Sequence, residues 1–240
     1  AGDITVEELR PLAEQTYGRI PARDVPERNR LIEPPQILER RIVLEHDRVE
    51  QPALMRSYLA PSFATAAGDE AYALEVLAEL FGSGGTSRLY RSLVVDQGLA
   101  AGAGAYYRGS SLDLTTFRVH ATPRPGGDLA TLERAIDAEI EKLLVDGLDA
   151  AEVDRVKQRM IAESIYARDS LTTAVRVFGS ALTTGSIVEE VEAWPEKIAA
   201  VTPADVQAAA KLVFNRDQSV TAHLVPARTA ASVPADGTTG

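Results

Sequence analysis

The sequence lacks several features that define common classes of protein. Its 240 residues include no cysteine, only three histidines and no apolar run approaching the length of a membrane span. Without cysteine the chain cannot form a disulfide scaffold, a cysteine-rich zinc site or a thiol nucleophile. Without a long apolar run it is expected to contain no membrane-spanning helix.

Positive charge is also scarce. The chain carries 25 Lys and Arg residues against 35 Asp and Glu residues, which gives a net charge of −10 with histidine neutral, and no basic patch offsets this excess. Nucleic acids and anionic membrane surfaces are bound mainly through clustered Lys and Arg. Both are therefore disfavoured as partners.

The three histidines are too far apart in sequence to build a helical metal site. They are His46, His120 and His223, and no two lie within four residues of each other. One helix face presents two ligands only at a spacing of three or four residues. A site assembled from all three would need a coincidence of the fold, so no metal ligand is expected. No serine lies in a Gly-x-Ser-x-Gly elbow, and no catalytic residue is assigned.

A glycine-rich segment at 82–85 could cradle a phosphate, but it lacks the residues that this role needs. No Gly-Lys-Ser or Gly-Lys-Thr follows it, and no Gly-x-Gly-x-x-Gly occurs. A turn between two helices is the simpler interpretation. We expect Gly82 to end the first helix in the left-handed conformation and Thr86 or Ser87 to cap the second.

Hydrophobic periodicity and turn residues predict an α+β fold with one mixed, mostly antiparallel sheet and helices packed on one of its faces. Strands are expected near residues 40–45, 52–59, 102–107, 114–122 and 219–224. Helices are expected near residues 5–17, 69–81, 86–97, 129–145, 149–169, 171–183, 194–200 and 202–214.

Composition divides the chain into four parts. Residues 1–20 hold a short amphipathic helix that opens with a Thr-x-x-Glu capping box. Residues 21–36 contain four prolines among charged residues, which predicts an extended linker. The main domain is expected over 37–225, and the small, polar residues of 226–240 predict a loose tail.

The stretch from 69 to 104 carries a family resemblance. An amphipathic helix at 69–81 runs into the glycine-rich turn, a second helix opens with Ser-Arg-Leu at 87–89, and Gly-Leu-Ala at 98–100 precedes a strand. This order resembles the C-terminal, non-zinc half of zinc peptidases of the insulinase/pitrilysin family, of the bacterial processing-peptidase-like type. The resemblance extends over nearly the whole chain and implies a half-unit that is duplicated in the parent protein.

The resemblance implies that catalysis belongs to the other half. In that half a His-x-x-Glu-His helix and a distant Glu bind zinc, and the Glu of the motif takes a proton from the metal-bound water. The expected counterpart here, the helix at 69–81, has no histidine. The family therefore implies no cofactor in this chain, zinc in a partner half, and no peptidase activity of this chain alone. Residues 1–20 would be a remnant of the preceding domain in a longer protein.

In active relatives this half supplies an Arg and, seven residues later, a Tyr that help to hold the substrate. Aligned on the Gly-Leu pair at 98–99, those positions are Val94 and Ala101, so both functional groups are lost. Arg91 and Tyr106 are the candidates for substrate contact in their place. Both could instead be structural, Arg91 as a solvated helix residue and Tyr106 as a packed strand aromatic.

Three further features receive structural interpretations. Glu75 and Glu79 form an i,i+4 acidic pair, which we expect on a solvated helix face. Trp194 and Pro195 are expected to anchor the start of a helix. The charged run at 166–170 is expected to be a junction between two helices, because charged residues at such places usually cap or pair.

The expected function is the non-catalytic half of a zinc-dependent endopeptidase, which pairs with a zinc-bearing half or subunit to enclose and bind peptide. Peptide could add as a strand to an edge of the sheet, through backbone hydrogen bonds. Two alternatives stay open: a structural or assembly subunit of the same fold without a peptidase role, and an unrelated α+β binding domain. The isolated chain could form a homodimer. For the compartment, the resemblance favours the bacterial periplasm over the cytoplasm.

Overall fold

A five-stranded sheet in the order β1-β5-β2-β4-β3 forms the centre of the protein. The structure is a computed structural model that describes residues 2–24 and 34–227. Strands β1 and β5 pair in parallel, and the other neighbours pair antiparallel. The strands are β1 Arg40–His46, β2 Ala53–Ala60, β3 Ala100–Tyr107, β4 Thr115–Pro123 and β5 Ser219–Pro226. The predicted mixed, mostly antiparallel sheet is confirmed.

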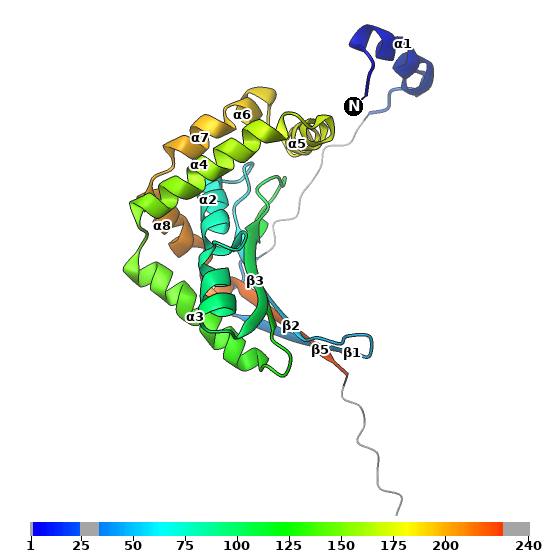
Figure 1. Cartoon of the computed structure of the whole chain (residues 1–240). Helices are drawn as coiled ribbons and strands as arrows, with labels where there is room; N and C mark the ends of the chain where they lie inside the picture. The colour runs from blue at the N-terminus through cyan, green and yellow to red at the C-terminus, as the bar shows by residue number, and fades with distance from the viewer. Residues whose placement is uncertain (1, 25–33, 228–240) are drawn as a thin grey trace, which may run out of the picture.

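Helices cover one face of this sheet and leave the other uncovered (Figure 1). The α-helices of the described residues are α1 Val6–Thr16, which does not contact the sheet, and α2 Glu70–Gly82, α3 Leu129–Asp146, α4 Ala150–Ala167, α5 Leu171–Thr183, α6 Val188–Glu192, α7 Trp194–Ala200 and α8 Pro203–Val213. Short turns of other helix types are η1 Tyr17–Arg19, η2 Tyr90–Asp96 and η3 Arg216–Gln218. The α+β class is therefore confirmed.

Strand alternation sorts side chains between the two faces. In β2, Leu54 and Tyr58 are buried under the helices, whereas Met55 is 43% exposed on the other side. The centre of the core is aromatic: Phe214, directly after α8, lies with ring centroids 5.3 Å from Tyr58 and 5.4 Å from Phe117. Edge-to-face contacts of this kind favour a fixed arrangement of the rings.

A charged cluster also lies on the covered face, and nothing in the local sequence predicts it. The guanidinium of Arg56 is 1% exposed. It donates to Glu133 at 2.6 Å, to the Thr221 hydroxyl at 2.9 Å and to Asp137. Arg41 makes a two-pronged contact with the same Glu133, at 2.8 and 2.7 Å. The cluster thus ties α3 to three neighbouring strands.

The role predicted for Gly82 is wrong. Its φ is not positive, so it is not a left-handed cap. A Cβ at Gly82 would lie 1.8 Å from the backbone nitrogen of Ala105, and one at Gly104 would lie 2.8 Å from the Gly82 carbonyl oxygen. Glycine is present because the end of α2 and strand β3 meet backbone to backbone.

The helix predicted at 86–97 differs in type and in its cap. Residues Tyr90–Asp96 wind as a π-helix, and Gln97 N–H donates to the carbonyl of Ser92 at 2.9 Å. The Ser87 hydroxyl donates to the Gly84 carbonyl at 2.8 Å, so it stabilises the preceding turn and caps no helix. Wide turns of this kind are recurrent near functional sites.

The N-terminal helix stands apart from the sheet (Figure 1). Its capping box is present: Thr5 Oγ1 accepts from Glu8 N–H at 3.3 Å, and the Glu8 carboxylate accepts from Thr5 N–H at 3.0 Å. No residue of α1 is buried. Of the predicted linker and tail, residues 25–33 and 228–240 lie outside the described residues. The domain boundaries remain predictions. Within the described ranges, no helix is long and apolar enough to cross a membrane.

Candidate functional site

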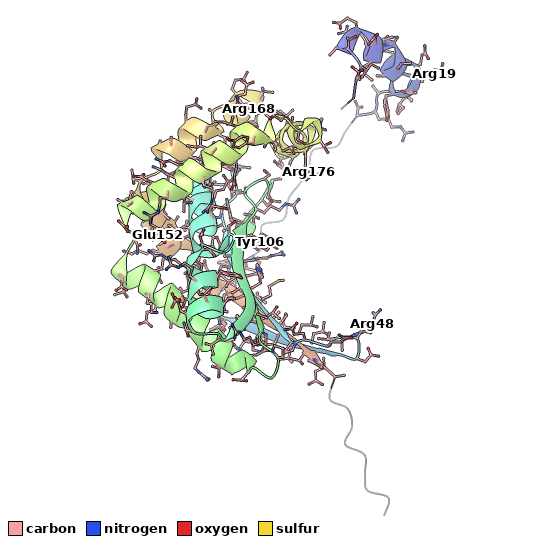
Figure 2. All side chains as sticks on the ribbon, viewed as in Figure 1. Arg19, Arg48, Tyr106, Glu152, Arg168 and Arg176 are labelled. Carbon is pink, nitrogen blue, oxygen red and sulfur yellow. The ribbon has the colours of Figure 1, made fainter. Side chains whose placement is uncertain are left out.

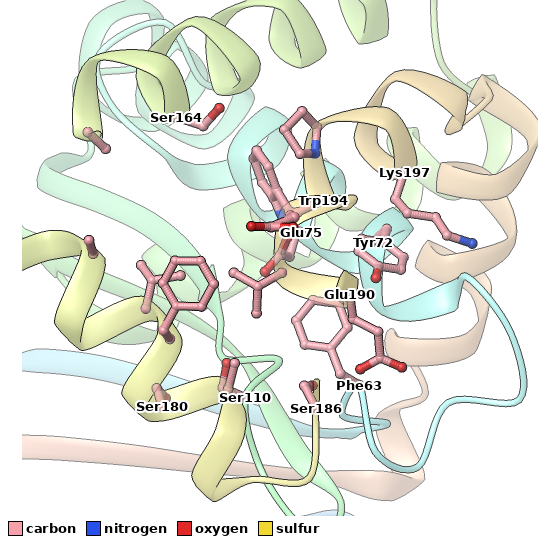
Figure 3. A pocket seen from close by; sticks show the side chains of 18 of the residues that line it. Phe63, Tyr72, Glu75, Ser110, Ser164, Ser180, Ser186, Glu190, Trp194 and Lys197 are labelled. Atoms are coloured by element: carbon pink, nitrogen blue, oxygen red, sulfur yellow. Dashed lines mark hydrogen bonds between the residues drawn. The ribbon is translucent and has the colours of Figure 1, made fainter. Parts of the chain in front are cut away.

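A cavity of about 1000 Å³ opens among α2, α5, α6 and α7 and the loops before α2 and after β3 (Figure 3). Its walls include Phe63, Tyr72, Glu75, Phe178, Glu190 and Trp194. Helix α6, which the sequence did not predict, closes one side. The described part of the chain therefore contains a concave site of the size that organic ligands or side chains occupy.

Glu75 lies on the wall between this cavity and a second one of about 380 Å³. Both cavities are lined by Glu75, Ser164, Ala167 and Trp194. The indole Nε1–H of Trp194 donates to the Glu75 carboxylate at 2.6 Å. Burial raises the pKa of Glu75 to about 7, and the hydrogen bond from Trp194 opposes only part of that rise.

The prediction of a solvated acidic face on α2 is wrong for both glutamates. Nine of the 13 residues of α2 are buried, so the helix has little solvated face. Glu79 is paired with Arg159 Nη2 of α4 at 2.8 Å. Glu75 forms no ion pair within the described residues. The two carboxylates have the i,i+4 spacing of ligands on one helix face. However, Glu79 forms an ion pair with Arg159, and Glu75 accepts a hydrogen bond from the Trp194 indole.

No metal site is evident among the residues that the structure describes, where no group of three or more His, Cys, Asp or Glu could hold an ion. The three histidines do not meet. His120 of β4 pairs in register with Met55 on the uncovered face. His223 Nε2 lies 3.1 Å from Glu133 on the covered face, and His46 ends β1. The strand pleat puts His223 on the opposite face from His46 and His120, and β5 and β2 lie between the strands of those two.

The two candidate contact residues lie on different elements. Arg91 is exposed on η2. Tyr106, on the edge strand β3, is 42% exposed, and its hydroxyl accepts from Arg118 Nη1 at 2.7 Å. Of the positions that lost the family pair, Val94 packs against the core and Ala101 is exposed beside a β-bulge. Substrate contact by Arg91 and Tyr106 stays a prediction.

Tyr106 belongs to a polar group on the uncovered face, which also contains Arg118 and His120 of β4. The Arg118 guanidinium carbon lies 5.7 Å from the centre of the Tyr106 ring, and the His120 ring lies 6.4 Å from it. Burial lowers the pKa of His120. Guanidinium N–H groups and a phenol hydroxyl can bind the carbonyl groups of an extended chain.

The predicted structural roles of two segments are borne out, with one addition. The run at 166–170 does join α4 to α5, and the Ser170 hydroxyl caps α5 by accepting from Thr173 N–H at 3.3 Å. Helix α7 does begin at Trp194. The addition is the contact of Trp194 with Glu75, for which the one sequence signal is an acid inside the otherwise apolar run at 71–78.

Comparison with known proteins supports the same family as the sequence. The family model described as the peptidase M16 inactive domain matches residues 1–160. No curated protein sequence matches the chain closely enough to count as a relative.

Three solved structures share the fold. A protease from Helicobacter pylori has a TM-score of 0.83 at 24% identity, over 94% of this chain and 53% of that one. The peptidase M16 inactive domain from Pseudomonas fluorescens has a TM-score of 0.72 at 18% identity, over 94% and 52%. The first half of the periplasmic protease PqqL from Escherichia coli has a TM-score of 0.75 at 15% identity, over 93% and 50%.

This chain spans about half the length of each of these three structures. At such identities the likeness shows the fold alone, whereas the family model covers two thirds of the chain. The order of motifs at 69–104, the sheet with one uncovered face and the family match agree. The chain belongs to the family of peptidase M16 inactive domains.

Proposed function

We propose that this chain is the non-catalytic half of a zinc-dependent endopeptidase, which pairs with a zinc-bearing half and binds the peptide enclosed between them. The observation that carries this proposal is the uncovered face of the sheet. A sheet of five strands normally buries both faces or presents polar residues to water on one of them. Here the free face combines apolar and hydrogen-bonding side chains.

The apolar part of this face lies on β1, β5 and β2. Ile42 of β1 and Met55 of β2 flank Ala222 of β5 in the strand register, so all three side chains point to the same side. Ile42 is 53% and Met55 is 43% exposed, and Leu44 and Leu59 are 57% and 41% exposed. Contiguous exposed apolar residues of this kind mark surfaces that contact another protein or a ligand.

The polar part lies on β4 and β3, where Arg118, His120 and Tyr106 offer hydrogen bonds. Strand β3 is the last in the sheet order, so one of its edges has no strand beside it in the described fold. Such an edge presents backbone N–H and C=O groups that an extended peptide can pair with. Peptide would then lie along β3 with Tyr106 beside it.

The test combines this chain with a zinc-bearing half that carries the His-x-x-Glu-His motif from the same protein or genome. Light scattering should detect a one-to-one complex, and elemental analysis should find one zinc per complex but no stoichiometric zinc in this chain alone. Mass spectrometry should detect cleavage of unstructured peptides only when both halves are present. A zinc half with the motif Glu replaced by Gln is the control for contaminating proteases.

Two outcomes would contradict the proposal. The first is chelator-sensitive cleavage by this chain alone that survives repurification. The second is that the two chains form a complex, but the zinc half alone cleaves peptides as well as the complex does. That result would instead support a structural subunit. A homodimer of the isolated chain would be visible in the same light-scattering measurement. The periplasm is the compartment we propose, by analogy with the fold neighbour from Escherichia coli.

A further inference from the structure

We propose that the cavity among α2, α5, α6 and α7 is a specificity pocket for a basic side chain, lysine or arginine, of the bound peptide, with Glu75 as its anionic anchor. This inference rests on the proposed peptide-binding role, and it adds a site that the role by itself does not require.

The carboxylates around the cavity differ in their partners. Asp69 at its rim is paired with Lys197 at 3.0 Å, and Glu79 behind it is paired with Arg159 at 2.8 Å. Glu75 has the Trp194 indole as its hydrogen-bond donor and, within residues 2–24 and 34–227, no cation. A partly buried carboxylate without a cation is costly, and an incoming ammonium or guanidinium group would reduce that cost.

Aromatic side chains on the cavity wall also suit a basic side chain. The rings of Phe63 and Tyr72 lie 5.0 Å apart at an angle of 58°, and Phe178 and Trp194 line the same cavity (Figure 3). Aromatic faces attract cations and cover the methylene stem of a long basic side chain. Tyr72 already holds a cation in this way, because Lys197 Nζ lies 5.9 Å from its ring centre.

The position of the smaller cavity also supports this pocket. The smaller cavity, which shares Glu75 and Trp194 with the larger one, is also lined by Tyr106 and Tyr107 at the end of β3. A peptide paired along the free edge of β3 would therefore pass the mouth of this space. A lysine or arginine side chain has the length to reach inward from such a backbone to a carboxylate on the dividing wall.

The cationic side chains at the rim of the cavity do not neutralise Glu75. Arg168 and Arg176 also line the cavity, but both are exposed and lie at the end of the helical layer that carries α5 (Figure 2). Their charged ends can turn to water, and Glu190 and Glu192 line the same rim. At the inner wall, Glu75 is the ionisable group, and a bound cation would favour its negative form.

The test uses the 240-residue chain and its single tryptophan, Trp194, as a reporter inside the site. Two extended peptides are compared, one with a central lysine and one with acetyllysine at the same place. Binding is followed by anisotropy of a label on the peptide, and occupation of the pocket by Trp194 fluorescence. We expect the lysine peptide to bind about tenfold more tightly or better, since a hydrogen bond to a charged group contributes that much.

The matched variants are Glu75→Gln, which keeps an acceptor for the Trp194 indole, and Glu141→Gln on the exposed side of α3. The preference for lysine should disappear in the first and persist in the second. Since the comparison of the two peptides needs no variant, the test stands even if a variant folds poorly. n-Butylammonium, the head of a lysine side chain, should also change Trp194 fluorescence in the parent and not in Glu75→Gln.

The outcomes separate this inference from the proposed function. Equal binding of the two peptides by the parent would overturn the pocket and leave peptide binding intact. No peptide binding, with a Glu75-dependent response to n-butylammonium, would support the pocket and overturn peptide binding by this half. No response to either probe would overturn both.

Discussion

Two partly enclosed carboxylates in this protein have opposite surroundings. Beneath α3, Glu133 contacts Arg41, Arg56 and His223. Burial raises its pKa, but the hydrogen bond from Arg41 and the charges of Arg56 and Arg41 outweigh that effect and lower the pKa to about 2. Between α2 and α7, Glu75 has no such cation among the residues that the structure describes, and burial raises its pKa to about 7.

This difference in surroundings indicates a structural role for Glu133 and a candidate binding role for Glu75. The charge of Glu133 is matched by cations from the fold itself, so this carboxylate acts as a structural cross-link that joins α3 to the sheet. A carboxylate that is enclosed beside a cavity without a cation is costly to the fold, and perturbed groups in cavities are candidates for binding. Three measurements can break or sharpen this comparison.

The largest effect on stability is expected in the charged cluster of Arg56 and Glu133, between α3 and the sheet. Arg56→Met removes the cation that lies between Glu133 and Asp137 and takes one hydrogen-bond donor from each carboxylate, while Arg41 and His223 still contact Glu133. Breaking a buried pair from one side should lower the free energy of unfolding by about 3–5 kcal/mol, measured by urea denaturation. The exposed Arg134→Met on the same helix is the control and should change stability by less than about 0.5 kcal/mol. A loss below about 1 kcal/mol for Arg56→Met would show that the cluster is not a cross-link.

A smaller effect of opposite sign is expected at Glu75. Its pKa is raised from 4.5 to about 7 by the fold, so its contribution to stability is complete below pH 4.5 and is lost as the pH rises through 7. Glu75→Gln removes this loss. The variant should match the parent near pH 4.5 and exceed it at pH 8 by at most about 3 kcal/mol, less where water screens the side chain.

Thermal or urea unfolding at the two pH values checks this prediction, with Glu141→Gln as the control that should keep the parent's pH dependence. Glu133 provides the internal contrast, since its pKa is lowered to about 2. Its contribution is present above pH 4.5 and is lost as the pH falls toward 2. A Glu75→Gln variant that is no more stable than the parent at pH 8 would mean that Glu75 is well solvated.

The smallest effect on stability is expected at two exposed residues, Tyr106 on the uncovered face and Arg91 on η2. Tyr106→Phe and Arg91→Ala should each change the free energy of unfolding by less than about 0.5 kcal/mol, because both side chains are exposed. In the complex with the zinc half, losing one hydrogen bond to substrate should lower kcat/KM by about 3–10-fold. Tyr166→Phe, an exposed tyrosine at the end of α4, is the control. Unchanged kcat/KM in both test variants would remove them from the site.

Much of the fold could be predicted from the sequence because its signals are local. The predicted limits of α5 and α7 match the structure, and the capping box at Thr5 forms as expected. Each depends on residues within a few positions along the chain, where periodicity and capping chemistry act. The family was likewise evident from the order of short motifs between 69 and 104, and the family model confirms it.

Only the tertiary structure decided which charged side chains have a partner of opposite charge and which are enclosed without one. Glu75 meets Trp194 across 119 residues of sequence, and Arg56 meets Glu133 across 77. Neither contact produces a periodic pattern in the sequence. An i,i+4 acidic pair therefore has the same sequence pattern whether it faces water or a cavity. The amino-acid sequence by itself determined the strands, most of the helices and the family. Burial, which sets the cost of a charge, is a property of the assembled fold.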